Sequence, residues 1–545
     1  VRTDKFPDFP GLVSELHAEN VRVILWVTSM VNVENPDYDM CVENQYLVRN
    51  GEGVVRPLKW WHGSGGLLDY SNPAAVEWWH STIDRVLDVG VDGFKCDGTD
   101  PYILEYQLAT GALGYNDQPL TYTQYSEFYY GDFFNYTRAK RGKEGLIMSR
   151  PIDCADSADV GCIPMSPKYV MYSGWMGDDD ASFQGLRSCA RKVIYAAHDG
   201  YMNFGCDIGG YRGIDVSQKE LFLRWSQLGA FLPLMENGGG GEHRPWMYDE
   251  ETVDIYRQYV LEHYKLIPYM LTTGNQATEQ GISSITPMSP PDTENPLHHP
   301  EPTTFSYLLG LDILVHPVVT SKGSMGDDDT SISTTGVSTE GLDTSMNHVR
   351  MTFPDDTDTD TVTEWLDYFH PNNEKMIEKG VSNRALALSD YAVYVRRGAL
   401  VPLQPTRPIK QTELDYDYAT APVVFTWYAP KPPSTTDTTT TTTTTTSEVR
   451  EFDGNGLTAS VTLDNTGMLV GSISAHDSYS SGFDIIGITN PTDVVIEEGV
   501  DSNTNNDTNN KCTWEYMGID NTLSIRCHTL TSGIRITATG VKNTF

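Results

Sequence analysis

Three aspartates each follow a short run of small and apolar residues, a placement that could deliver carboxylates to one shared site. Asp97 ends "GVDGFKCD", Asp178 follows "KYVMYSGWMG", and Asp207 ends "YMNFGCD". Two carboxylates beside a glycosidic bond can divide the work of cleaving it. One attacks the anomeric carbon, while the other protonates the leaving oxygen and then deprotonates water. The three acids therefore make sugar chemistry a hypothesis that the fold can test.

Other residue types near these acids favour a neutral ligand rich in hydroxyl groups. Arg150 ends the run "GLIMSR", and the aromatic residues Trp61, Trp175 and Trp246 lie near other strand ends. Sugars present C–H faces to aromatic rings and hydroxyl groups to carboxylates and guanidinium groups. No basic cluster of the kind that binds phosphate accompanies them.

Each of these residues also has a purely structural interpretation. An aspartate at a strand end is often a helix N-cap, and the "DDD" at 178–180 can be a solvated turn. Arg150 can pair with a structural acid, and His243 can be a bystander. The "GGGG" at 238–241 favours a flexible loop, since no GK[ST] follows it as in a phosphate-binding loop. Their shared position at strand ends is the stronger indication.

The elements that must position these residues are apolar runs alternating with amphipathic segments, such as "PAAVEWWHSTIDRVLDVG". This alternation predicts an α/β fold with a parallel sheet wrapped by helices, and the active site at the carboxyl ends of the strands. A closed barrel needs eight strands, so the prediction is either an open sheet or an incomplete (β/α)8 TIM barrel lacking its first strands. Six such runs start at Val21, Gly90, Gly145, Lys168, Tyr201 and Ala230.

The pattern changes after about residue 283, where short strands with Pro and Gly turns replace it. We therefore predict a catalytic barrel over 1–282, a proximal antiparallel β-sandwich over 283–403 and a distal β domain over 404–545. The distal part contains "STTDTTTTTTTTTS", whose composition predicts a flexible or O-glycosylated loop.

Charge and composition exclude several classes of partner. The formal net charge of −36 argues against nucleic acid and anionic membrane surfaces, both of which attract basic proteins. No apolar run approaches about 18 residues, the length that would suggest a membrane span. No signal peptide or initiating Met is visible, so the chain reads as a fragment or a processed form. We expect a small-molecule or oligosaccharide substrate, and the sequence does not indicate an oligomeric state.

The cysteines and glycosylation motifs favour the secretory pathway or the extracellular space. Cys154 with Cys162 and Cys512 with Cys527 are candidate disulfides, and four further cysteines lie near apolar stretches. Asn135 begins one N-glycosylation sequon, and a second begins at residue 506. No Cys or His group has the spacing of a zinc site, so we expect no metal and no cofactor.

Taken together, the ordered motifs resemble glycoside hydrolase family 31, which includes α-glucosidases, α-xylosidases, α-galactosidases and sulfoquinovosidases. The motifs are "GVDGFKCDGTDP", "LIMSR", "SGWMGDDDASFQGLR", "MNFGCDIGGYRG" and "RWSQLGAFLPLMEN". The resemblance implies a retaining mechanism with Asp97 as nucleophile and Asp178 as general acid/base. It further implies that Arg150, Asp207 and Trp61 contact the sugar.

The chain departs from the family at two motifs and one single position. The usual "DMNEP" reads "DGTDP", which places Asp100 where Glu is typical, and the usual "RNH" reads "ENGGGGEH", so that His243 is the substitute for a displaced histidine. Lys95 stands where α-glucosidases of the family have Trp, and is expected to contact a sugar hydroxyl or an anionic substituent. The resemblance also implies that the first barrel strands are absent from this chain.

The sequence therefore predicts a retaining, exo-acting α-glycosidase that removes terminal α-linked sugars. Within the same site the alternative is an α-transglycosylase, in which a sugar hydroxyl replaces water. The altered motifs leave open a non-catalytic carbohydrate-binding relative or an inactive fragment. A structural or adhesion protein built on the Thr-rich and β-rich C-terminal region would leave the ordered acids unexplained.

Overall fold

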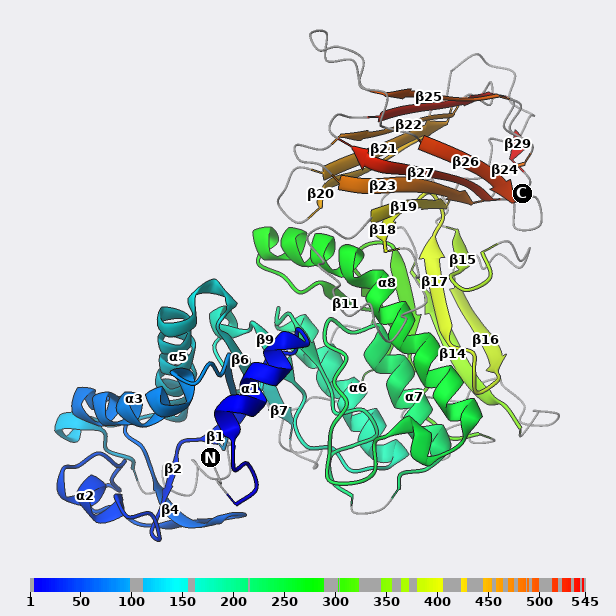
Figure 1. Cartoon of the computed structure of the whole chain (residues 1–545). Coiled ribbons are helices and arrows are strands. Elements are labelled where there is room, and N and C mark those ends of the chain that lie inside the picture. The colour runs from blue at the N-terminus through cyan, green and yellow to red at the C-terminus, as the bar shows by residue number, and fades with distance from the viewer. Residues whose placement is uncertain are drawn as a thin grey trace, which may run out of the picture.

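The computed structural model has a helix-rich N-terminal part and a C-terminal part made of β-sheets (Figure 1). Helices α1 (Phe9–Ala18) to α8 (Glu250–Gln280) belong to the first part, and the second begins at β11 (Ile285–Pro287). The structure describes residues 4–98, 111–154, 162–213, 216–288, 302, 304–322, 345–354, 364–371, 380–404 and 423–428, together with strands β20 to β29 between 445 and 543.

A parallel five-stranded sheet forms the centre of the N-terminal part, in the order β1-β5-β6-β9-β10. All four strand pairings are parallel. Because parallel strands end at the same edge, the residues that follow them gather there. The strands are β1 (Ile24–Thr28), β5 (Gly93–Asp97), β6 (Leu146–Ser149), β9 (Ser173–Trp175) and β10 (Phe204–Gly205).

Five of the six predicted runs contain a strand of this sheet, and the sixth prediction is wrong. The segment from Ala230 to Asn237 forms a single bridge, from Glu236 to Asp207, rather than a strand. Pro233 lies in this segment and has no N–H to give to a ladder of hydrogen bonds. The segment still runs beside β10, because Leu234 N donates to Phe204 O at 3.3 Å.

Strand β5 shows how the sheet sorts its side chains. In "GFKCD" the side chains of Phe94 and Cys96 are buried in the core against the helices. Since successive side chains of a strand point to opposite faces, Lys95 and Asp97 point together to the other face. The single strand therefore supplies one cation and one carboxylate to the same side of the sheet.

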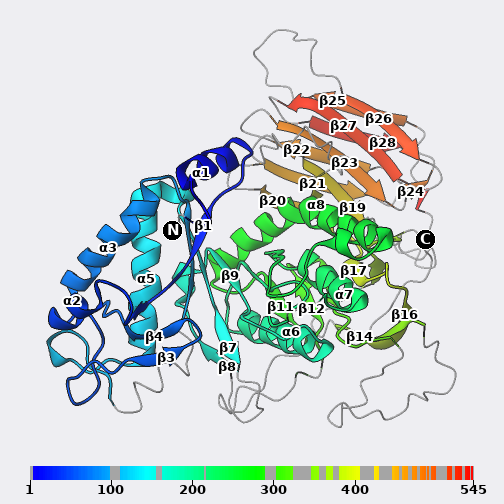
Figure 2. The same cartoon turned by 60° about the horizontal axis from the view of Figure 1, so that its bottom comes forward.

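The helices begin where the sequence offers caps, and two of them cover one part of the sheet. Helix α3 (Pro73–Leu87) starts at the N-cap Asn72, and α5 (Tyr122–Arg141) starts with a capping box formed by Thr121 and Gln124. The two helices lie side by side (Figures 1 and 2). Among the described residues, no helix is both long and apolar enough to cross a membrane.

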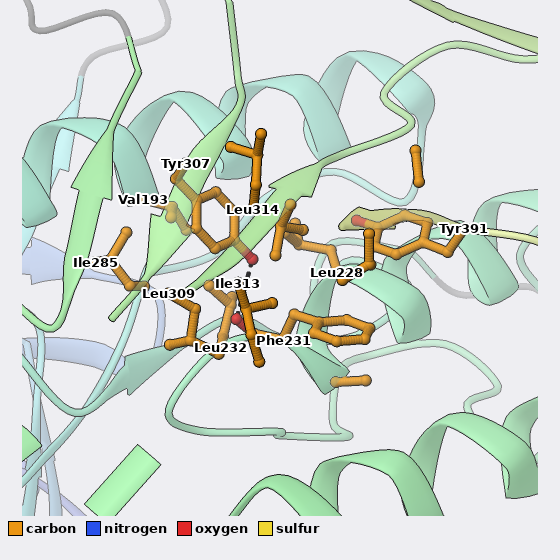
Figure 3. Packing of buried hydrophobic residues seen from close by; sticks show 14 of the residues in the cluster. Val193, Leu228, Phe231, Leu232, Ile285, Tyr307, Leu309, Ile313, Leu314 and Tyr391 are labelled. Atoms are coloured by element: carbon orange, nitrogen blue, oxygen red, sulfur yellow. Dashed lines mark hydrogen bonds between the residues drawn. The ribbon is translucent and has the colours of Figure 1, made fainter. Parts of the chain in front are cut away.

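A second core joins the N-terminal part to the C-terminal sheet β11-β12-β13-β17-β15 (Figure 3). After β11, its strands are β12 (Tyr307–Leu309), β13 (Ile313–His316), β15 (Trp365–Asp367) and β17 (Ala392–Arg396). Helices α6 (Phe183–His198) and α7 (Lys219–Ala230) contribute residues from one side. Among the hydrogen bonds that cross this core is the one from Tyr307 Oη to Phe231 O, at 3.0 Å. The residues labelled in the figure are Val193, Leu228, Phe231, Leu232, Ile285, Tyr307, Leu309, Ile313, Leu314 and Tyr391.

The C-terminal part is mostly antiparallel, as predicted, with one exception. Two five-stranded sheets follow in the orders β18-β19-β23-β27-β26 and β20-β21-β22-β28-β25. The strands of the second sheet are β20 (Thr445–Phe452), β21 (Leu457–Leu463), β22 (Leu469–Ser474), β25 (Asp493–Glu498) and β28 (Ile534–Thr539). The pair β19 (Val423–Tyr428) and β23 (Tyr479–Ile486) is parallel. Strand β18 (Leu400–Leu403) lies before the predicted boundary at residue 404 and pairs with β19 across it.

The strand register sets both predicted cysteine pairs opposite each other. Cys154 in β7 (Ile152–Cys154) faces Cys162 in β8 (Cys162–Pro164), and Cys162 is disulfide-bonded. Cys512 in β26 (Cys512–Met517) faces Cys527 in β27 (Thr522–Leu530). Cys41, Cys96, Cys189 and Cys206 are buried free thiols.

Candidate active site

One guanidinium group connects the two predicted catalytic carboxylates. Arg150 lies directly after β6, between the ends of β5 and β9 in the sheet. Its Nη2 atom donates to Asp97 Oδ1 at 3.2 Å and to Asp178 Oδ1 at 3.4 Å. The Arg150 side chain is 7% exposed, so the guanidinium group itself is largely buried.

This shared contact limits the distance between the two carboxylates. Because both oxygens contact the same nitrogen, they can be no farther apart than the distances of 3.2 Å and 3.4 Å laid end to end. Carboxyl groups of retaining glycosidases lie about 5–5.5 Å apart. The geometry of Asp97 and Asp178 is compatible with that separation. Asp178 is the more accessible of the two, at 32% exposed against 12% for Asp97.

The second oxygen of Asp97 is held by a residue at a strand end to which sequence reasoning gives no role. Trp26 Nε1, from the neighbouring strand β1, donates to Asp97 Oδ2 at 3.0 Å. The backbone carbonyl of Asp97 accepts from Tyr129 Oη at 2.9 Å. Gly98 follows with φ of +80°, and a Cβ there would lie 2.1 Å from Thr28 Oγ1. Only glycine fits this turn without a shift, so the position of Asp97 depends on it.

The three aspartates of "DDD" occupy three different environments. Asp178 contacts Arg150, Asp179 is buried against Lys192 Nζ at 2.9 Å, and Asp180 is 65% exposed beside Arg212. The N-cap of α6 is Ser182 and that of α7 is Gln218. Neither Asp178 nor Asp207 therefore caps the helix that follows it. The solvated-turn interpretation fits Asp180 alone.

Lys95 lies between two acids rather than alone. Its Nζ donates to Glu236 Oε1 at 3.0 Å and lies 4.0 Å from Asp207 Oδ1. Burial lowers the pKa of the ammonium group, but the carboxylates of Glu236, Asp207 and Asp97 together outweigh burial and raise that pKa above its ordinary value. Lys95 is therefore charged and already paired.

Asp207 has the most perturbed carboxyl group of the site. Its side chain is 3% exposed. Burial, and then the neighbouring charge of Glu236, raise its pKa to about 8. At neutral pH the group carries its proton and can donate a hydrogen bond. Its Oδ2 atom is buried and has no hydrogen-bond partner among the described residues, as expected for an atom that awaits a ligand.

The two predicted tryptophans of the site differ in accessibility. Trp61 is 48% exposed and lies in an aromatic group, 5.1 Å from Trp60, whose ring stacks on Trp26. Trp175 is 1% exposed. The Trp175 ring instead supports two cations, with Lys95 Nζ 4.5 Å and Arg150 Cζ 5.1 Å from its centroid. Trp175 therefore acts on the site by positioning charges.

His243 reaches the loop behind Asp207 but does not contact the carboxylates in the described residues. Its Nδ1 lies 2.7 Å from Ile208 O, which makes Nδ1 the donor. A Cβ on Gly239 would lie 2.4 Å from His243 Nε2, so the glycine run allows the backbone to pack against the ring. Asp100 of the altered "DGTDP" motif lies outside the described residues.

Sequence reasoning places Trp26 and Glu236 at strand ends on the side of the active site but gives neither a role, and both lie far from their partners along the chain. Glu236 and Lys95 are 141 positions apart, and Trp26 and Asp97 are 71 apart. Both residues lie within the apolar runs that mark the sheet and its last flanking segment. Their positions near the ends of these runs are the signal that could have identified them.

Comparison with known proteins supports the same fold. The family model described as "Glycosyl hydrolases family 31 TIM-barrel domain" matches residues 1–273. An α-xylosidase from Emericella nidulans is 25% identical over 59% of this chain and 39% of its own length. A 1,3-α-isomaltosidase from Kribbella flavida is 27% identical over 58% of this chain and 44% of its own length. The chain thus spans about two fifths of the length of these curated relatives.

Solved structures extend the likeness to nearly the whole chain. A cycloalternan-forming enzyme from Listeria monocytogenes, in complex with a pentasaccharide substrate, superposes with a TM-score of 0.71 at 19% identity, over 98% of this chain and 47% of its own. A dextranase from Flavobacterium johnsoniae gives a TM-score of 0.69 at 18% identity, over 97% and 63%. At identities of 19% and 18%, these structural matches show a shared fold and nothing further. The family model covers half of the chain, and the chain belongs to glycoside hydrolase family 31.

Proposed function

We propose that this protein is a retaining, exo-acting α-glycosidase, with Asp97 as nucleophile and Asp178 as general acid/base. The observation that carries the proposal is the single nitrogen, Arg150 Nη2, within hydrogen-bond distance of both carboxylates. The named activities of the relatives, an α-xylosidase and a 1,3-α-isomaltosidase among them, support the choice of α-linked sugars.

The chemistry follows in two displacements. In the first, Asp97 attacks the anomeric carbon, the bond to the leaving oxygen breaks, and Asp178 gives that oxygen its proton. In the second, Asp178 takes a proton from water, and the water oxygen displaces Asp97 from the sugar. Arg150 and Trp26 hold the two oxygens of Asp97, so its orientation is fixed before the sugar arrives. The greater exposure of Asp178 gives water access to it.

The remaining residues would hold the sugar ring. Protonated Asp207 is a hydrogen-bond donor, and Glu236 offers an acceptor in its buried Oε2, which has no partner among the described residues. Trp61 offers an exposed ring face near Trp60. We further propose that the five parallel strands are an arc of a (β/α)8 barrel, as the sequential order of β5, β6, β9 and β10 and the family model support.

Two substitutions test the catalytic assignment. We expect Asp97→Asn and Asp178→Ala each to lower turnover of nitrophenyl α-glycosides at least about a thousandfold. Asp178→Ala should retain more activity on an α-glycosyl fluoride, because fluoride leaves without a proton. The matched control is Asp180→Asn, whose carboxylate is 65% exposed. Normal turnover in either catalytic variant would refute the assignment.

The stereochemistry of the first product tests the retaining mechanism directly. Proton NMR of the freshly released sugar should show the α-anomer before mutarotation, and a β-anomer would exclude a double displacement. The same spectra, recorded with excess acceptor sugar, separate hydrolysis from α-transglycosylation. That alternative has support because one structural relative is a cycloalternan-forming enzyme.

We also propose a location in the secretory pathway or outside the cell. Disulfide-bonded Cys162 supports an oxidising compartment, where such bonds persist. Asn135, the first residue of a sequon, lies exposed on α5. Loss of mass on treatment of the native protein with an N-glycosidase would support this, and an unmodified Asn135 in peptide mass spectra would count against it.

A further inference from the structure

The strongest unassigned feature of the site is the ion pair between Lys95 and Glu236. The two side chains are 21% and 18% exposed, so the pair lies at the site rather than on the open surface. Lys95 comes from β5, and Glu236 from the segment that bridges to Asp207. The backbone bridge places Glu236 beside Asp207, and the Glu236 side chain reaches Lys95 from there.

The ion pair disfavours an anionic ligand beside Lys95. Nζ of Lys95 is 3.0 Å from Glu236 Oε1, and the ring of Trp175 packs 4.5 Å away. Around this cation lie the carboxylates of Glu236 and Asp97, with Asp178 beyond Arg150. An anionic sugar would have to approach these acids while the charge of Lys95 is already compensated. Like charges within a few ångströms in a partly buried site repel strongly.

The same arrangement suits an uncharged sugar. Glu236 Oε2 and Asp207 Oδ2 are buried atoms without a hydrogen-bond partner among the described residues. A carboxylate oxygen accepts from a hydroxyl group, and a protonated carboxyl group donates to one. Hydroxyl groups can both donate and accept, so a neutral ring satisfies both atoms without bringing a charge.

We propose that Glu236 is a specificity-determining residue that neutralises Lys95 and so reserves the site for uncharged sugars. The inference rests on the proposed function and names its substrate class. It replaces the expectation that Lys95 receives an anionic substituent. Glu236 neutralises the positive charge of Lys95, and the role of Lys95 is to hold that acid in place.

The test compares two ligands that differ only at one carbon, methyl α-D-glucoside and methyl α-D-glucuronide. Binding is measured by calorimetry in the Asp97→Asn background, which prevents turnover. The measurements are made at about pH 5, where the carboxyl group of the glucuronide is ionised. The quantity of interest is the ratio of the two affinities, glucuronide over glucoside.

Glu236→Gln should raise this ratio at least about tenfold, because it leaves the charge of Lys95 uncompensated. The double variant Lys95→Met/Glu236→Gln should bring the ratio back near its starting value. Lys95→Met alone should lower the ratio, because it leaves the acid without its cation. That variant keeps the proposal testable if Glu236→Gln does not fold.

The outcomes separate the inference from the function beneath it. Binding of the glucoside with a ratio that none of the three variants changes would overturn the role of Glu236 and leave the glycosidase proposal standing. Binding of neither ligand by any variant, with no turnover of neutral aryl α-glycosides by the native protein, would overturn both. A ratio that rises in Glu236→Gln and falls again in the double variant supports the inference.

Discussion

Asp207 should make this protein less stable as the pH rises, and Asp207→Asn should remove the effect. The ordinary pKa of an aspartate is 3.8, and in the folded chain that of Asp207 is about 8. Between these values the unfolded chain has lost the proton and the folded chain retains it. Fewer protons on the unfolded state mean that the free energy of unfolding falls as pH rises, by about 1.4 kcal/mol per pH unit. Over the whole window this is about 6 kcal/mol at most.

The assay is thermal or denaturant unfolding of the native protein and the Asp207→Asn variant from about pH 5 to about pH 8, at constant ionic strength. Groups that do not interact with Asp207 titrate alike in both proteins, so the difference between the two curves reports Asp207 together with its charged neighbours Glu236 and Lys95. The difference should change steadily in favour of the variant as pH rises. Asp254→Asn, which alters a side chain that is 73% exposed, should show no such trend. Parallel curves for native protein and Asp207→Asn would mean that Asp207 is ionised throughout, and would refute the reasoning.

Two further substitutions probe the support of the site. We expect Gly98→Ala to lower kcat/KM on nitrophenyl α-glycosides at least about tenfold, since its methyl would lie 2.1 Å from Thr28 Oγ1 and displace the neighbouring catalytic acid. Gly53→Ala has nearly the same φ, +79°, but no atom within 4 Å, and should keep full activity; equal losses would point to backbone strain alone. Lys192→Met should cost about 3–5 kcal/mol of unfolding free energy by leaving Asp179 buried and unpaired, and the double variant with Asp179→Asn should recover most of it in denaturant titrations.

The positions of the acids could be predicted because strand ends have a strong local signal. In "GFKCD" and "GCD" an apolar run ends at a carboxylate. Because the strands of the sheet are parallel, these carboxylates come together at one edge of it. The same reasoning placed Arg150 correctly beside Asp97 and Asp178. The local sequence pattern is enough to predict which residues meet when all of them lie at the carboxyl ends of parallel strands.

The pairing of charges could not be read from the sequence, because it depends on contacts between distant segments. The pattern that marks Glu236 as the end of an apolar run says nothing of Lys95, which lies 141 positions earlier. The composition of the sixth run predicts a strand, but Pro233 has no N–H to donate to β10, and this matters only once the two segments lie side by side. The burial of Trp175 beneath Lys95 and Arg150 likewise could not be predicted, because it depends on how β5 and β6 lie beside β9.

The core in Figure 3 also restricts how this chain can diverge from its relatives. Phe231 follows α7, while Tyr307 and Tyr391 come from the β region, and all three side chains fill one close-packed volume. A change of size on either side leaves a void or a clash for the other to absorb. The two regions must therefore be inherited as a unit. A chimaera that takes its β-sheet from another member of the family will fold well only if it brings the matching surface of α6 and α7 with it.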